Sequence, residues 1–272
     1  MDINRFFYDL DDMMAKGRAK EAIIFIGDGI AQAEKEGDKK SLIALYNEAG
    51  GLCRDFSKYD EAEAYYTDAL ALINEIDATD SESHATTLIN YGTCLGNRGE
   101  LEKAAGMFSQ AAGILVSLGM DRDYRMAALY NNMSWIAQEK GDLTDAEDYL
   151  NKAILLLRGV EDSEGEQAAS YTNLSNIYWA GGRLDEAKVM LIKAIDIYKE
   201  REYLRREGRY AAAVSALANI YFSEGDYEKS ASLCREAMAE IEKEFGKNDA
   251  WHVVADNLAA AEEKVDKMPK NC

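Results

Sequence analysis

Apolar residues recur at helical spacing, in paired runs, along almost the whole chain. The clearest pair lies between residues 166 and 201, where a Gly181-Gly182 turn separates two runs. The core positions of the two runs are Tyr171, Leu174, Ser175 and Tyr178, then Ala187, Leu191, Ala194 and Ile195. Apolar residues three or four apart line one face of a helix. The stretch therefore predicts two amphipathic helices joined by a tight turn.

The same unit recurs at a nearly constant interval along the chain. A small residue follows each mid-unit turn, and the series is Ala22, Ala62, Ala104, Ala146, Ala187 and Ser230. Five residues before each stands a residue that ends the first helix, and that series is Gly17, Ser57, Gly99, Gly141, Gly182 and Gly225. Glycine can adopt the left-handed conformation there, whereas Ser57 should cost about 1 kcal/mol. A fixed interval with one helix pair per unit indicates a solenoid.

The first helix of each unit, helix A, repeats four core positions. They are Tyr46/Ala49/Gly50/Cys53, Leu88/Tyr91/Gly92/Leu95, Tyr130/Met133/Ser134/Ala137, Tyr171/Leu174/Ser175/Tyr178 and Val214/Leu217/Ala218/Tyr221. Helix B repeats three positions, which are Ala62/Tyr66/Ala69, Ala104/Phe108/Ala111, Ala146/Leu150/Ala153, Ala187/Leu191/Ala194 and Ser230/Cys234/Ala237. Small residues allow helices to cross closely, and large ones fill the gap between units.

This pattern resembles the tetratricopeptide repeat (TPR), in the longer-spaced form found in kinesin light chain. The family's proline at the end of helix B is absent throughout. The resemblance implies an all-α fold, a right-handed α-solenoid of antiparallel helix pairs. We expect a single TPR solenoid over residues 1–268, with a tail at 269–272. Within it we expect a degenerate N-terminal helix pair (1–38), five TPR units (41–246) and a capping helix (248–268), with no DNA-binding helix-turn-helix before the repeats.

Composition and charge narrow the classes of partner. A single proline among 272 residues favours helices over a sheet. The net charge of −19 disfavours nucleic acid and an acidic membrane surface but allows a basic partner. No apolar run is long enough to span a bilayer, and the N-terminus lacks a signal-peptide pattern. The four cysteines show no disulfide or zinc spacing, so we expect a cytoplasmic protein.

Enzymatic chemistry finds no support in the residues. The two histidines, His84 and His252, belong to units that are far apart along the repeat, so a solenoid keeps them at a distance from each other. They cannot bind one metal ion or share a catalytic triad. We therefore predict no catalytic residues, no metal site and no cofactor.

An asparagine repeats on the side of helix A opposite the core, the face that lines the concave groove in this family. Its register holds Asn90, Asn132, Asn173 and Asn257, and Asn176 and Asn219 share the face. Asparagine is a poor mid-helix residue, but its amide can bond the backbone of any extended peptide. We interpret these six residues as a peptide-binding groove, with Trp135 as an apolar anchor. The alternative is that the amides bond a neighbouring helix or water.

Three functions remain open. The first is a scaffold or adaptor that holds an extended protein segment or peptide in the groove. The second is a peptide-sensing regulator that resembles bacterial quorum-sensing TPR receptors but lacks their DNA-binding domain. The third is a self-assembling structural protein, which the acidic charge and a polar end oppose. We expect a monomer or a weak dimer.

Overall fold

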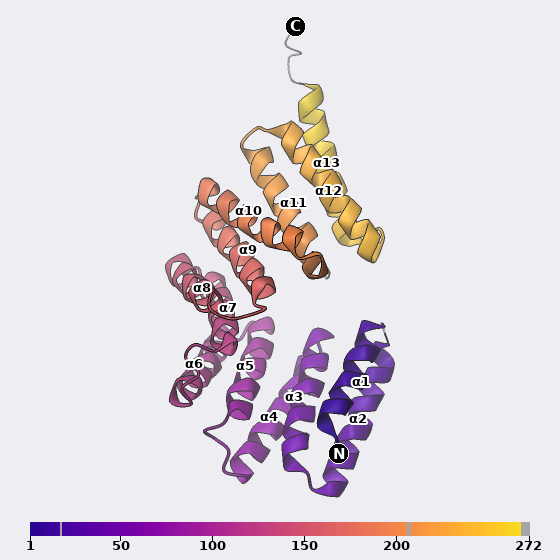
Figure 1. The fold of residues 1–272 in the computed structure, drawn as a ribbon, viewed down its shortest axis with the longest axis vertical. Helices are drawn as coiled ribbons and strands as arrows, with labels where there is room; N and C mark the ends of the chain where they lie inside the picture. Colours follow the sequence, from indigo (N-terminus) through magenta and orange to yellow (C-terminus); the bar gives the residue numbers. More distant parts are fainter. Residues whose placement is uncertain (17, 206–207, 268–272) are drawn as a thin grey trace. The chain divides into compact units, whose positions relative to one another are not determined.

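Helices make up both halves of the chain. The computed structural model describes residues 1–16, 18–205 and 208–267. Within these ranges thirteen α-helices and one short 3-10 helix alternate with tight turns, and none of the described residues forms a β-strand (Figure 1). The all-α prediction is confirmed. The chain divides into two compact units, Met1–Lys140 and Gly141–Cys272, and each is described by itself.

The first unit holds seven helices within its described residues. They are α1 (Ile3–Ala15), α2 (Ala19–Glu36), α3 (Lys39–Asp55), α4 (Tyr59–Glu75), α5 (Glu82–Asn97), α6 (Leu101–Ser117) and α7 (Tyr124–Glu139). Each helix packs against the next, and α5 also contacts α3 and α7. Helices α3, α5 and α7 are therefore the A helices of the repeat, and α2, α4 and α6 are the B helices.

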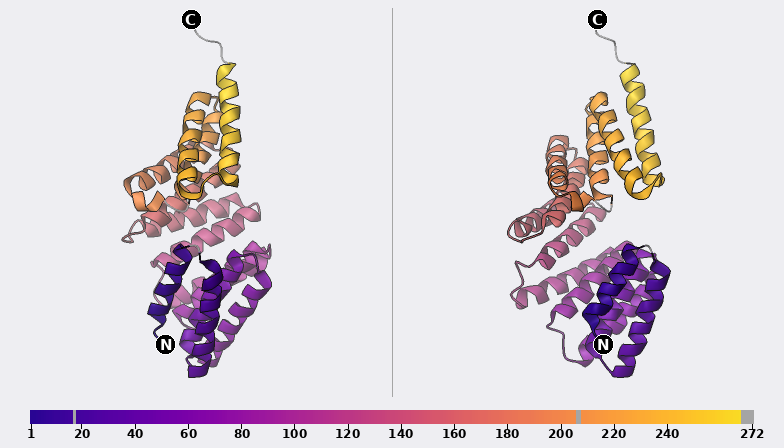
Figure 2. Two further views of the ribbon diagram at one scale, coloured as in Figure 1. Left: turned by 90° about the vertical axis from the view of Figure 1, so that its right-hand side faces the viewer. Right: turned by 45° about the vertical axis from the view of Figure 1, so that its right-hand side comes forward.

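The second unit holds the remaining helices. They are α8 (Leu143–Leu157), α9 (Glu164–Ala180), α10 (Leu184–Glu200), the 3-10 helix η1 (Glu202–Arg205), α11 (Arg209–Ser223), α12 (Tyr227–Phe245) and α13 (Asp249–Asp266). Consecutive α-helices again pack together, and α11 also contacts α13. Here α9, α11 and α13 are the A helices. Figure 2 shows the helices of each unit from two further sides. That the two units continue one solenoid over 1–268 stays a prediction.

The predicted helix B positions form the centre of the core. Every one of them is at most 1% exposed; they are Ala62, Tyr66, Ala69, Ala104, Phe108, Ala111, Ala146, Leu150, Ala153, Ala187, Leu191, Ala194, Ser230, Cys234 and Ala237. Helix A contributes a second row of buried and half-buried side chains. The positions that the sequence repeat predicts to be in the core are therefore the positions that are buried.

Two glycines of helix A show why that register needs small residues. A Cβ placed on Gly50 would lie 2.7 Å from Tyr66 Cε1, and one on Gly92 would lie 2.6 Å from Phe108 Cε1. Both distances are far inside van der Waals contact. Each glycine thus lets the B helix of its own pair place a fully buried ring directly on the A helix.

The mid-unit turns adopt the backbone conformation that the sequence predicts. Gly99, Gly141, Gly182 and Gly225 have φ between 72° and 89°, and Ser57 has φ 59° at the same place. A β-carbon in this region clashes with the following carbonyl, so Ser57 holds a strained conformation. Gly17, which the same pattern includes, lies outside the described residues.

The two ends of the chain differ from the regular units. In the N-terminal pair the Phe6 ring stacks on Phe25 at 4.2 Å between ring centroids. A Cβ on Gly29 would lie 2.6 Å from the Phe6 ring, so a small residue is needed there too. At the other end α13 begins at Asp249, and the Asn248 side chain accepts a hydrogen bond from Trp251 N at 3.0 Å. The predicted end at residue 268 and the tail lie outside the described residues.

Candidate functional site

The predicted asparagines differ in exposure between the two units. Asn90 on α5 and Asn132 on α7 are half-buried, and Asn257 on α13 is half-buried as well. The exposed members are Asn173 and Asn176 on α9 and Asn219 on α11. The face of the A helices that carries them, called the A face below, is therefore more open in the second unit.

In the first unit the amides form a ladder between neighbouring A helices. Asn90 Nδ2 donates to Asn47 Oδ1 at 3.2 Å, and Asn47 Nδ2 donates to Thr87 Oγ1 at 2.8 Å. Asn132 Nδ2 donates to Thr93 Oγ1 at 3.4 Å. The amide nitrogens of Asn90 and Asn132 therefore bond neighbouring helices, which is the alternative to peptide binding. Their hydrogen bonds join α3 to α5 and α5 to α7.

Asn47 is the residue of this ladder that sequence reasoning missed. It stands one position before the asparagine register, where Glu48 occupies the register itself. A hydrogen bond to Ile43 O at 2.9 Å holds its side chain toward α5. Thr87 follows Asn47 by close to one repeat length, and that spacing was the available signal.

Trp135 is less free than an anchor on an open face would be. Its ring lies against Gly96 of α5, so closely that a Cβ on that glycine would overlap it. The side chain is half-buried. Because Gly96 has no side chain, the indole can pack directly on the backbone of α5. Trp135 thus packs α7 on α5 and presents only part of its surface to a ligand.

In the second unit one amide pair crosses between A helices and leaves others unused. Asn257 Nδ2 donates to Asn219 Oδ1 at 3.3 Å. Asn219 Nδ2 takes no part in that bond. Within the described residues, the Asn176 side chain makes no hydrogen bond. Asn173 does interact with the rest of the protein. The second unit therefore has amide groups that form no hydrogen bond within the described part of the fold and can bind a ligand.

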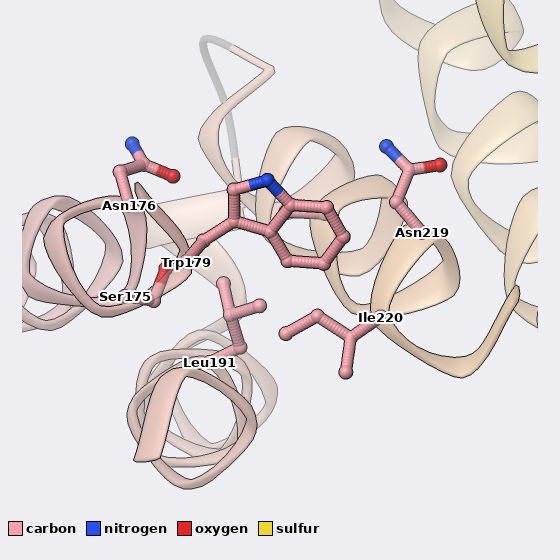
Figure 3. A pocket seen from close by; sticks show the side chains of 7 residues that line it. Ser175, Asn176, Trp179, Leu191, Asn219 and Ile220 are labelled. Atoms are coloured by element: carbon pink, nitrogen blue, oxygen red, sulfur yellow. The ribbon is translucent and has the colours of Figure 1, made fainter. Parts of the chain in front are cut away.

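These unused groups border a pocket of about 190 Å³ between α9, α10 and α11. It is lined by Ser175, Asn176, Trp179, Leu191, Ala216, Asn219 and Ile220. Figure 3 shows the Trp179 indole between the Asn176 and Asn219 carboxamides, with Leu191 and Ile220 beneath the ring. Trp179 is 42% exposed, a high value for so large an apolar residue. We call this site the Trp179 pocket.

The fold explains how the pocket stays open. Ala216 stands where the asparagine register skips the fifth unit, and its short side chain leaves room beside the indole. Leu191 belongs to the helix B core and is 1% exposed, so the floor is fixed. Ser175 Oγ donates to Thr172 O at 2.7 Å and so bonds within its own helix. Trp179 alone does not make the pocket, because its walls come from α9, α10 and α11 together.

A polar clamp fixes α9, which carries Trp179, on α8. Tyr178 Oη donates to Glu147 Oε1 at 3.0 Å, and Arg183 Nη1 pairs with Glu147 Oε2 at 2.6 Å. The Arg183 guanidinium also lies over the Tyr178 ring, 4.2 Å from its centroid. Burial and the Glu147 carboxylate together raise the pKa of Tyr178. A similar clamp in the first unit joins Tyr91 and Arg98 to Glu63 at 2.5 and 2.7 Å.

The pocket's chemistry suits recognition. Its walls combine an exposed indole face and aliphatic floor with two amides that can donate and accept hydrogen bonds. None of its seven lining residues titrates near neutral pH. Among the described helices, none combines the length and apolar character that crossing a bilayer requires.

The fold and this surface define a TPR-type α-solenoid protein. The family described as the MalT-like TPR region matches residues 52–264. The chain therefore belongs to that family, and the resemblance read from the repeat is confirmed. No curated protein matches the sequence.

Several solved structures share the fold at low sequence identity. BtubC (BKLC) from P. vanneervenii is 19% identical, with a TM-score of 0.67 over 93% of this chain and 94% of that one. The apo form of RapI is 15% identical, with a TM-score of 0.73 over 97% and 72%. NprR in complex with its cognate peptide NprX is 13% identical, with a TM-score of 0.66 over 99% and 76%. At such identities the likeness shows the fold.

Proposed function

We propose that the protein is a non-enzymatic scaffold or adaptor that holds an extended peptide or protein segment on the A face of its second unit. The observation that carries this proposal is the Trp179 pocket, where an exposed indole lies between two amides that the fold leaves available. A family of TPR repeats and the peptide complex of NprR support the same class of ligand.

Each part of the pocket has a separate role in this proposal. The Trp179 ring and the Leu191 floor would hold one apolar side chain of the ligand. Asn176 and Asn219 would bond the ligand backbone on either side, which gives affinity that depends little on ligand sequence. Asn173 and Asn257 would extend this row, whereas Asn90, Asn132 and Trp135 would contribute only the surface that their helix contacts leave free.

The test is a peptide selected on the wild-type protein from a display library, with its Kd measured on variants. Losing two hydrogen bonds of about 0.5–1.5 kcal/mol each, Asn176→Ala/Asn219→Ala should weaken binding roughly 5- to 150-fold. Trp179→Ala should weaken it by about 2 kcal/mol or more, as expected for a central aromatic anchor. Because no lining residue titrates, the Kd of a histidine-free peptide with a blocked amino terminus should stay constant between about pH 6 and 8.

A matched control separates the pocket from a general loss of asparagine. Asn151 is an exposed asparagine on α8, a B helix, so Asn151→Ala removes the same group outside the A face. That variant should bind the peptide as the wild type does. Equal affinity of the double pocket variant and the wild type would refute the proposal.

A second candidate function is a peptide-sensing regulator that acts on another protein when its ligand binds. The fold shared with the NprR–NprX complex favours this candidate. A sensor should change its radius of gyration in small-angle scattering when the selected peptide is added. A scaffold should bind the same peptide with no such change. We propose a cytoplasmic location for either function on the grounds of composition.

A further inference from the structure

The interfaces between successive repeat pairs carry ion pairs at one recurring place. A residue at the end of an A helix pairs with a residue near the start of the preceding B helix. Arg98 pairs with Glu63 at 2.7 Å, Lys140 with Glu102 at 2.8 Å, and Glu224 with Lys188 at 2.6 Å. Arg98, Lys140 and Glu224 each stand directly before the turn glycine of their own unit, so they occupy one register. Charge at this place is thus common to both units.

The first interface departs from that pattern. Phe56 stands at the same register, directly before Ser57, and Ile23 stands where Glu63 and Lys188 stand, one residue after the repeat alanine. Both are large apolar residues, and each is 48% exposed. An apolar pair thus replaces the ion pair between α2 and α3.

Ile23 and Phe56 border an apolar groove of about 80 Å³ over α2, α3 and α4. Leu52, Cys53 and Tyr65 contribute to its walls. An apolar cavity of about 150 Å³ holds a benzene-sized molecule, so this groove has room for one aliphatic side chain or part of an aromatic one. We call it the Ile23–Phe56 groove. The B helices form its sides, so it is separate from the A face that holds the asparagines.

The charges around the groove are mostly negative. Lys58 and Glu61 stand at its edge and pair with each other at 3.1 Å. Asp68 acts on the Tyr65 wall, where burial and nearby carboxylates raise the pKa of the phenol. Within the described residues Asp68 forms no ion pair. The Glu61 and Asp68 carboxylates near Tyr65 therefore outnumber the single Lys58 ammonium.

We propose that the Ile23–Phe56 groove docks a basic segment of a partner protein, which inserts one apolar side chain between Ile23 and Phe56. Lysine or arginine side chains beside it would meet Asp68 and Glu61. Exposed apolar surface with a charged rim is typical of interaction sites. A second copy of the chain is a poor occupant because each copy carries a net charge of −19.

The chain itself supplies the design of the test variant. Ile23→Glu/Phe56→Arg installs at the first interface the pair that Glu63 and Arg98 form at the next one. The groove is then bridged by a salt bridge while the fold keeps a native type of contact. Its melting temperature should equal or exceed that of the wild type. Phe56→Ala is the second variant, for use if the double variant does not fold.

The probe is a displayed library of peptides with a fixed central leucine and random flanks, selected on the wild-type protein. Enriched peptides should carry lysine or arginine beside the leucine. They should bind the wild type at least tenfold more tightly than the double variant, and more weakly as the salt concentration rises. Asn176→Ala/Asn219→Ala should bind them as the wild type does, which keeps this result independent of the Trp179 pocket.

Three outcomes would overturn the proposal. One is a selection without groove-dependent peptides, and another is enrichment of acidic or neutral flanks. The third is a wild-type dimer in sedimentation analysis that Ile23→Glu/Phe56→Arg abolishes, because the occupant would then be a second copy.

Discussion

Gly92 on α5 allows a sharp test of how the repeat packs. Replacing a helical glycine by alanine normally stabilises a protein, by about 1 kcal/mol, since alanine has the higher helix propensity. At Gly92, however, the added methyl group would lie 2.6 Å from Phe108 Cε1 and 2.9 Å from Phe108 Cδ1. Phe108 is 0% exposed, so its ring has no free space into which to move. We expect overpacking to cancel or exceed the gain in helix propensity.

The magnitude follows from a matched glycine on the partner helix. Gly106 on α6 is exposed, and a Cβ there would meet nothing within 4 Å. Gly106→Ala therefore keeps the full gain of about 1 kcal/mol. Overpacking a core costs about 1–3 kcal/mol. Both variants gain the same free energy from the higher helix propensity of alanine. Gly92→Ala should therefore be less stable than Gly106→Ala by about 1–3 kcal/mol, the cost of overpacking.

The assay is thermal unfolding of the wild type and both variants, followed by circular dichroism. For a protein of this size a difference of about 1 kcal/mol shifts the melting temperature by about 2–4 °C. The two variants should therefore melt about 2–12 °C apart, with Gly106→Ala above the wild type. If Gly92→Ala melts as high as Gly106→Ala, the close contact between α5 and Phe108 is wrong.

Three other variants test the polar contacts. Arg183→Ala should lower the melting temperature, through loss of the ion pair with Glu147 and of the contact with Tyr178, and the decrease should shrink in high salt. The hydrogen bonds from Tyr91 and Arg98 lower the pKa of Glu63 below its usual 4.5, so this group stabilises the fold above that pH and the benefit is lost as the pH falls through the lowered pKa; the difference in urea midpoint between wild type and Glu63→Gln should accordingly be larger at pH 7 than at pH 4. Asn90→Ala should destabilise the fold by about 0.5–1.5 kcal/mol in chemical unfolding and should weaken peptide binding less than Asn176→Ala/Asn219→Ala does; an equal loss of affinity would mean that the ladder itself binds ligand.

Much of the fold could be predicted because the same spacing of small and large core residues recurs in each repeat. The small residue that recurs once in each repeat, alanine in all but the last, and the turn residue five positions before it define both helices of a repeat. Even Ser57, the one departure, adopts the left-handed conformation of the glycines that it replaces. The periodicity is strong because each position meets the same neighbours in every unit.

The site could be predicted only in part, because exposure on the A face depends on which neighbour each residue finds. Asn90 and Asn132 share a register with Asn173, but their amide nitrogens donate hydrogen bonds to side chains on the preceding A helix. The helical spacing places Trp135 on the outward face, but its ring packs against Gly96 of α5. The Trp179 pocket needs Ala216 and Leu191 from two other helices. These contacts join residues from different helices. The periodic spacing along a single helix does not predict them.

The most direct measurement is a titration of the selected peptide followed by the indole N–H signals in nitrogen-15 NMR. The chain has three tryptophans, Trp135, Trp179 and Trp251, so three signals can be assigned by single Trp→Phe variants. The proposed function predicts that the Trp179 signal shifts with the peptide and saturates at the measured Kd, while the Trp251 signal stays in place. A bound peptide that leaves the Trp179 signal unchanged would contradict it.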